Sequence, residues 1–179
     1  MHDRGARGVQ DTAEAARLYR KSAEQGFAPA QFRLGKMYHV GEGVTQDSLV
    51  AFRWYNWAAE QGLPEAQCQL GFMYESGKGV ERNRVEAIRW YRRAAEHGQA
   101  RTRLHLGCMC AEDDGVVQDL VEAHMWLSLA GSLEGEVDQE LRAGLLDDFE
   151  REMSPDQIAE AKRRTKEWRR IHEPGSAEN

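Results

Sequence analysis

The stretch that decides the fold runs from Ala51 to Val80 and reads AFRWYNWAAEQGLPEAQCQLGFMYESGKGV. Its features recur on both sides at an interval of 36 residues. The Leu-Gly pair shows this register at Leu34-Gly35, Leu70-Gly71 and Leu106-Gly107. The Ala-Ala-Glu motif before a glycine shows it at Ala58-Ala59-Glu60 and Ala94-Ala95-Glu96. So many positions in one register indicate an internal repeat rather than chance.

Each repeat is predicted to form a hairpin of two helices. The first, helix A, is expected over Asp47 to Gln61, with the Asp47 carboxylate as its N-cap and Gly62 as its stop. The second, helix B, is expected over Pro64 to Glu75, because proline costs nothing in the first turn of a helix. Gly71 leaves room where two helices approach closely. One such hairpin cannot bury its apolar face alone, so the hairpins must stack, which predicts an all-α fold of the α-solenoid class.

The period also predicts how the chain is divided. The predicted parts are residues 1–10, a remnant of an upstream helix B with its loop; 11–46, repeat 1; 47–82, repeat 2; 83–118, repeat 3; 119–153, a divergent repeat 4; 154–173, a capping helix; and 174–179, a disordered tail. Met1 to Gly5 lie 36 residues before Met37 to Gly41, which end a helix B. The second helix of repeat 4 is expected over Glu134 to Glu152, and a capping-box start at Ser154 predicts the last helix.

The residues from Ala51 to Val80 fit the pattern A-x-x-W-Y-x-x-A-A-E-Q-G-x-x-x-A-Q-x-x-L-G-x-M-Y-x-x-G-x-G-V. This pattern resembles that of the Sel-like repeat (SLR) family in the tetratricopeptide-repeat superfamily, and the resemblance covers about residues 8 to 132. It implies a curved, non-enzymatic scaffold that binds other proteins, with helix A on the concave face. It also implies an alternative, an immunity or inhibitor protein that blocks a bacterial toxin or effector.

The outward positions of helix A carry an arginine register, which we define as Arg17, Arg53 and Arg89, each 36 residues apart. Trp57 stands where the neighbouring repeats have Lys21 and Arg93, and a tryptophan beside arginine is typical of binding hot spots. The predicted partner-binding residues of the concave face are Arg17, Arg20, Lys21, Arg53, Asn56, Trp57, Arg89, Arg92, Arg93 and Met125.

Two interpretations of this surface stay open. It forms a groove for an acidic or extended partner segment, or it is a solvated helix face held by i,i+4 pairs such as Arg20 with Glu24 and Arg92 with Glu96. For Trp57 the rival interpretation is packing against the next repeat.

Composition and spacing argue against several other classes of protein. Lys and Arg number 24 against 30 Asp and Glu, a net charge of −6, whereas nucleic-acid-binding domains are normally basic. No apolar run approaches the roughly 20 residues of a membrane span. His105, Cys108 and Cys110 do not converge as zinc ligands should, so we predict no metal and no cofactor. No nucleophile stands with a base in a recognisable context, so we predict no catalytic residues.

The two ends of the chain carry further expectations. The last helix has a local excess of Lys and Arg, which either contacts nucleic acid or anionic lipid or forms the solvated face of a capping helix. The incomplete first repeat would leave an apolar end that can associate with a second copy. The location is expected to be cytoplasmic if Met1 is the native start, and periplasmic if a signal segment was removed.

Overall fold

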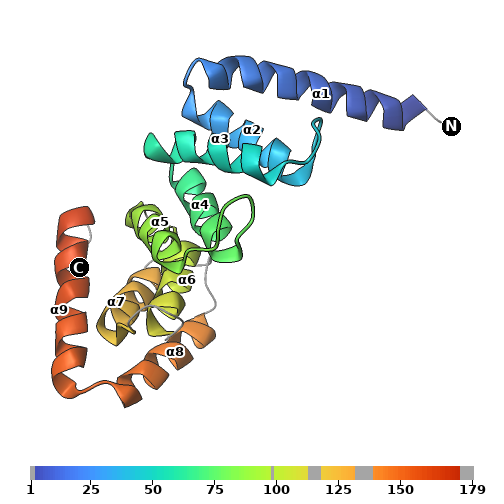
Figure 1. Cartoon of the computed structure of the whole chain (residues 1–179). Helices are drawn as coiled ribbons and strands as arrows, with labels where there is room; N and C mark the ends of the chain where they lie inside the picture. The colour runs from blue at the N-terminus through green and yellow to red at the C-terminus, as the bar shows by residue number, and fades with distance from the viewer. Residues whose placement is uncertain (1–2, 98, 113–117, 132–138, 174–179) are drawn as a thin grey trace. The chain divides into compact units, whose positions relative to one another are not determined.

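The computed structural model describes residues 3–97, 99–112, 118–131 and 139–173. Within these residues the regular elements are all helices, and no strand occurs (Figure 1). The helices are α1 (Asp3–Glu24), α2 (Ala28–Val40), α3 (Ser48–Glu60), α4 (Pro64–Ser76), α5 (Arg84–Glu96), α6 (Ala100–Ala111), α7 (Leu120–Ala130), α8 (Gln139–Glu152) and α9 (Pro155–His172). The fold is therefore all-α, as the period predicts.

The helix ends follow the local rules that the sequence indicates. Asp47 caps α3 by accepting a hydrogen bond from the backbone N–H of Val50 at 3.0 Å. Gly77 ends α4 in the left-handed conformation, with a φ of 70°, which glycine adopts without steric cost. Ser154 starts α9 with a complete capping box, in which its side chain and that of Gln157 each accept from the other's backbone N–H.

The chain divides into two compact units, Met1–Trp90 and Tyr91–Asn179. In the first unit, α2 packs closely on α3, and the core contains both small and large side chains. Its fully buried members include Ala51, Tyr55 and Leu70. A Cβ atom added to Gly35 would lie 2.8 Å from Cδ1 of Tyr55. Two helices therefore approach closely at this Leu-Gly position, as the pattern predicts, and they are a helix B and the next helix A.

The second unit is built on the same contact and closed by α9. α6 packs on α7 through Gly107, where an added Cβ would lie 2.9 Å from Cγ of Leu127. α9 also packs on α7. At this contact the rings of Trp126 and Trp168 meet edge to face, with their centroids 6.1 Å apart. The residues of α8 are exposed or half-buried, and Leu141 is 53% exposed, so α8 contributes less to the core than a regular helix B.

The described backbone differs from the prediction at the N-terminus. Residues from Asp3 onward belong to one continuous helix, α1, rather than to a remnant and a loop. The loop of the other repeats needs a glycine with positive φ, at Gly43 (67°) and Gly79 (74°), and Arg7 holds the equivalent position. Because an L side chain disfavours that conformation, the helix continues. The start of the predicted helix over 134–152 and the tail over 174–179 lie outside the described residues.

Candidate functional site

The outer members of the arginine register are engaged within their own helices. Arg17 forms a two-pronged contact with Glu14, with N–O distances of 2.9 and 2.7 Å. This contact lowers the pKa of the Glu14 carboxyl. Arg89 lies 3.5 Å from the carboxylate of Glu86. Both pairs are i,i+3 neighbours exposed to solvent, which contribute little to stability.

The middle member of the register differs from the other two. Val50 stands three residues before Arg53, where the other repeats have glutamate. Among the described residues, no carboxylate pairs with Arg53, and its side chain is exposed. Trp57 follows at i+4, on the same face of α3. The sequence therefore leaves one guanidinium available beside one tryptophan.

Trp57 is held in place although it is exposed. Half of its surface (50%) is open to solvent, and its ring meets the ring of Trp54 edge-on, with centroids 4.7 Å apart and an angle of 77°. Trp54 in turn packs against the buried residues Ala23, Ala30 and Leu34. The exposed ring thus rests on a half-buried one that the core fixes. Aromatic pairs in this geometry contribute beyond their buried area.

A hollow of about 370 Å³ lies beside this pair of rings. Its lining comes from the end of α1, the turn that follows, the first half of α2, and α3. The lining residues are Ala23, Glu24, Gly26, Gln31, Trp54 and Trp57. Gln31 donates to the carbonyl of Ala23 at 3.1 Å. Gln61 donates both to Oε1 of Gln31 (2.7 Å) and to the carbonyl of Trp57 (3.1 Å). These hydrogen bonds fix the wall of the hollow.

Other predicted residues find partners within the chain. Arg20 donates to the Tyr38 hydroxyl at 2.7 Å, and Arg92 of α5 donates two bonds to Glu122 of α7, both at 2.6 Å. These contacts replace the i,i+4 pairs with Glu24 and Glu96 that the sequence suggests. Lys21 is exposed, and three predicted residues are half-buried: Asn56, Arg93 and Met125.

Arg103 has a structural role that the sequence did not lead us to expect. Gln31, Gln67 and Arg103 occupy one position of the repeat. Each donates to the carbonyl oxygen eight residues earlier, at the end of the preceding helix A: Gln67 to Ala59 at 3.3 Å and Arg103 to Ala95 at 3.0 Å. The change from glutamine to arginine in one repeat is the signal that could have found it.

Arg103 links three helices of the second unit. Its side chain is buried (2% exposed), donates to the carbonyl of Leu129 at 3.0 Å and lies 3.5 Å from the carboxylate of Glu173. Its guanidinium stands 4.5 Å above the ring of Trp168. Burial lowers the pKa of Arg103, and Glu173 opposes this shift. Arg103 therefore joins the ends of α5, α7 and α9.

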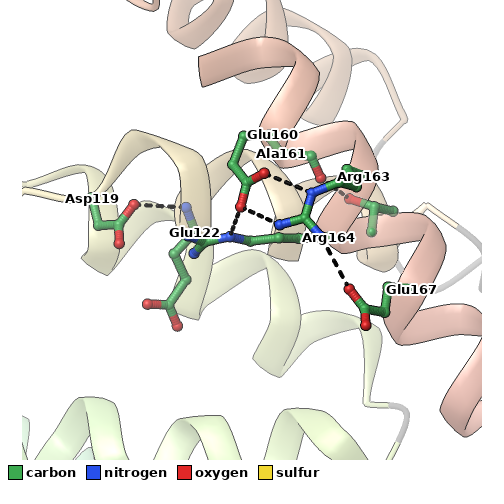
Figure 2. Close-up of polar contacts among 8 residues, drawn as sticks. Asp119, Glu122, Glu160, Ala161, Arg163, Arg164 and Glu167 are labelled. Carbon is green, nitrogen blue, oxygen red and sulfur yellow. Dashed lines mark hydrogen bonds and ion pairs between the residues drawn. The ribbon is translucent and has the colours of Figure 1, made fainter. Parts of the chain in front are cut away.

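One face of α9 balances its own charges. Figure 2 shows Glu160 between Arg163 and Arg164, with bonds of 2.7 to 2.8 Å, and Glu167 reached by Arg163 at 3.4 Å. The two arginines lower the pKa of Glu160 to about 2. The basic excess of the last helix is therefore neutralised on this face.

The described residues also bear on the predicted absence of a metal site and of a membrane span. They contain no group of three or more His, Cys, Asp or Glu side chains that could hold a metal ion. Cys110 is buried and Cys108 half-buried, and burial raises the pKa of the Cys108 thiol. None of the described helices is both long and apolar enough to cross a membrane.

The chain matches the Sel1 repeat over residues 1–27, 28–63, 64–99 and 103–134, and it belongs to the Sel1 repeat family. It is similar to a Sel1 repeat protein from Oxalobacter formigenes, with 38% identity and a TM-score of 0.64, over 67% of this chain and 49% of that one. It is also similar to a protective antigen present in uropathogenic Escherichia coli strains that displays an SLR fold, with 26% identity and a TM-score of 0.55. That match covers 89% of this chain and 41% of the antigen.

The chain thus spans less than half the length of each of these two solved structures. No curated protein matches it. The matches confirm the α-solenoid fold class. Sel1 repeat proteins generally act as scaffolds for protein–protein interaction.

Proposed function

We propose that the protein is an interaction scaffold that holds an extended segment of another protein on the exposed face of α3. The observation that carries this proposal is the juxtaposition of Arg53, Trp57 and the hollow beside Trp54. An aromatic side chain that is exposed yet fixed loses little conformational entropy on binding, and tryptophan and arginine dominate interface energetics.

The chemistry of this face defines the segment that it accepts. An apolar side chain of the partner fills the hollow against the two tryptophan rings. A neighbouring carboxylate pairs with Arg53, whose guanidinium fork matches a carboxylate in two-pronged geometry. Arg17 and Arg89 already have glutamate partners, so they contribute less than the arginine register suggests.

The test compares two double variants as immobilised bait for the proteins of the cell that makes this chain. Arg53→Glu with Trp57→Ala removes the proposed contacts. Arg33→Glu with Phe72→Ala likewise reverses one charge and removes one aromatic ring, at exposed positions of α2 and α4. We expect quantitative mass spectrometry to show partners that the control variant retains and the α3 variant loses by about tenfold or more, which corresponds to ~1.4 kcal/mol. Identical sets of retained proteins for both variants would refute the proposal.

A further inference from the structure

A second hollow lies in the other unit, between α7 and α9. It encloses about 500 Å³, within the usual range for ligand pockets. Its lining includes His124, Lys162, Thr165, Lys166, Arg169 and Arg170. His124 and Thr165 are buried, whereas Lys162, Lys166 and Arg170 are exposed. The floor of the pocket is therefore formed by buried side chains, whereas its rim is basic.

The positive charge of this pocket is largely uncompensated. Glu150 of α8 lies at its edge and contacts both Nε2 of His124 (3.0 Å) and Nζ of Lys162 (3.1 Å). These contacts lower the pKa of Glu150, so the group is a carboxylate. Among the described residues, no carboxylate pairs with Lys166, Arg169 or Arg170. The opposite face of α9 differs, because Glu160 and Glu167 balance its arginines.

Arg169 presents an unused donor at this site. Its Nη2 donates to the carbonyl of Ser128 at 3.1 Å, which fixes the guanidinium. Its Nε is buried and has no hydrogen-bond partner among the described residues. A buried donor without a partner is costly, and an anionic acceptor in the pocket would satisfy it.

We infer that this pocket binds a carboxylate-bearing peptide segment, an acidic stretch of a partner protein. The guanidinium of Arg169 and the heads of Lys166 and Arg170 bind the carboxylates, and the aliphatic stems of these side chains pack along the rest of the segment. The donors surround a hollow with a buried floor, rather than a flat basic surface such as a bilayer or a nucleic-acid backbone contacts. This inference concerns α9 and does not depend on the proposed role of α3.

The test measures the binding of an acetylated tetraglutamate peptide to the full chain at low ionic strength by calorimetry. Lys166→Glu with Arg170→Glu reverses two pocket charges, and Arg163→Glu with Arg164→Glu makes the same change on the balanced face. We expect the pocket variant to weaken binding by about tenfold or more and the control variant to weaken it by about threefold or less. Tetraglutamine should not bind.

Several outcomes would overturn the inference. They are the absence of tetraglutamate binding to the parent chain, equal weakening by the two double variants, and equal binding of tetraglutamine. Succinate that competes as well as the peptide at the same carboxylate concentration would assign the pocket to free organic acids instead. Pocket-dependent binding of an oligonucleotide or of phosphatidylserine vesicles in place of the peptide would also contradict it. Circular dichroism spectra of the variants and the parent chain are compared to check that each variant is folded.

Discussion

Replacement of Arg103 tests how the second unit is held together. Arg103→Met keeps an unbranched chain of similar length but removes every donor, so the carbonyls of Ala95 and Leu129 both lose a charged partner. Hydrogen bonds to charged groups contribute about 1.5–3 kcal/mol each. Part of this loss is offset, because the variant no longer bears the free-energy cost of removing a cation from water. We expect Arg103→Met to lower the free energy of unfolding by about 3 kcal/mol.

The repeat itself supplies a graded comparison. Gln67 holds the equivalent position and keeps the single bond to the preceding helix. Arg103→Gln should therefore retain the bond to Ala95 and lose only the one to Leu129, for a loss of about 1.5 kcal/mol. Gln67→Met breaks one neutral hydrogen bond and should cost ~1 kcal/mol.

Urea unfolding of the full chain, followed by circular dichroism and tryptophan fluorescence, measures these differences. Hydrogen exchange of α7 and α9 should show which helices lose protection. If Arg103→Met falls within ~0.5 kcal/mol of the parent chain, near the size of an ordinary surface substitution, the reasoning fails. It also fails if the Gln variant is as destabilised as the Met variant. The Gln variant keeps the test informative if the Met variant does not fold.

The remaining predictions concern packing, pH and the exposed ring. Gly35→Ala places a Cβ against Tyr55 and should destabilise the chain by about 1–3 kcal/mol. At Gly144 no atom lies within 4 Å of an added Cβ, so Gly144→Ala should stabilise the chain by about 0.5–1 kcal/mol. Equal effects of the two variants on thermal unfolding would contradict the packing at Gly35. The pKa of the Glu160 carboxyl should be about 2 in the folded chain, against an ordinary value of 4.5, so the stabilisation from this group is present above pH 4.5 and is lost as the pH falls toward 2. A midpoint near 4.5 in a carboxyl NMR titration would show that the arginine contacts do not persist in solution. Trp57→Ala should lower the free energy of unfolding by only about 1 kcal/mol, because it removes the ring pair with Trp54 from a side chain that is already half solvated. A loss of several kcal/mol would mean that the ring is structural.

Local signals were sufficient for the helices and their ends. The Asp47 cap, the Gly62 stop after α3, where φ is 86°, and the capping box at Ser154 each depend on residues within three or four positions, so the sequence predicts them directly. The close contact at Leu-Gly positions also followed from the period. The continuous α1 was not predicted, because one glycine of the loop pattern is missing at Arg7 and the comparison with Met37 to Gly41 concealed this change.

Contacts between helices were harder to predict. Arg92 has a glutamate four residues along its own helix, yet it pairs with Glu122, 30 residues away, because packing brings α7 within reach. The pocket at α9 arises in the same way, since spacing alone does not show which arginines meet a carboxylate and which do not. For the arginine register, the sequence did contain the deciding difference, at Val50, but its meaning depends on the exposure of Arg53.

The most direct test of the scaffold account is site-specific photocrosslinking in the cell that makes the protein. A benzophenone amino acid is placed at Glu24, an exposed residue that lines the hollow beside Trp57, in one variant and at Phe72, which is 38% exposed on α4, in another. The account predicts that a discrete partner protein crosslinks at Glu24, that Arg53→Glu with Trp57→Ala abolishes this product, and that it is absent at Phe72. Equal products at the two positions, or no product at Glu24, would contradict it.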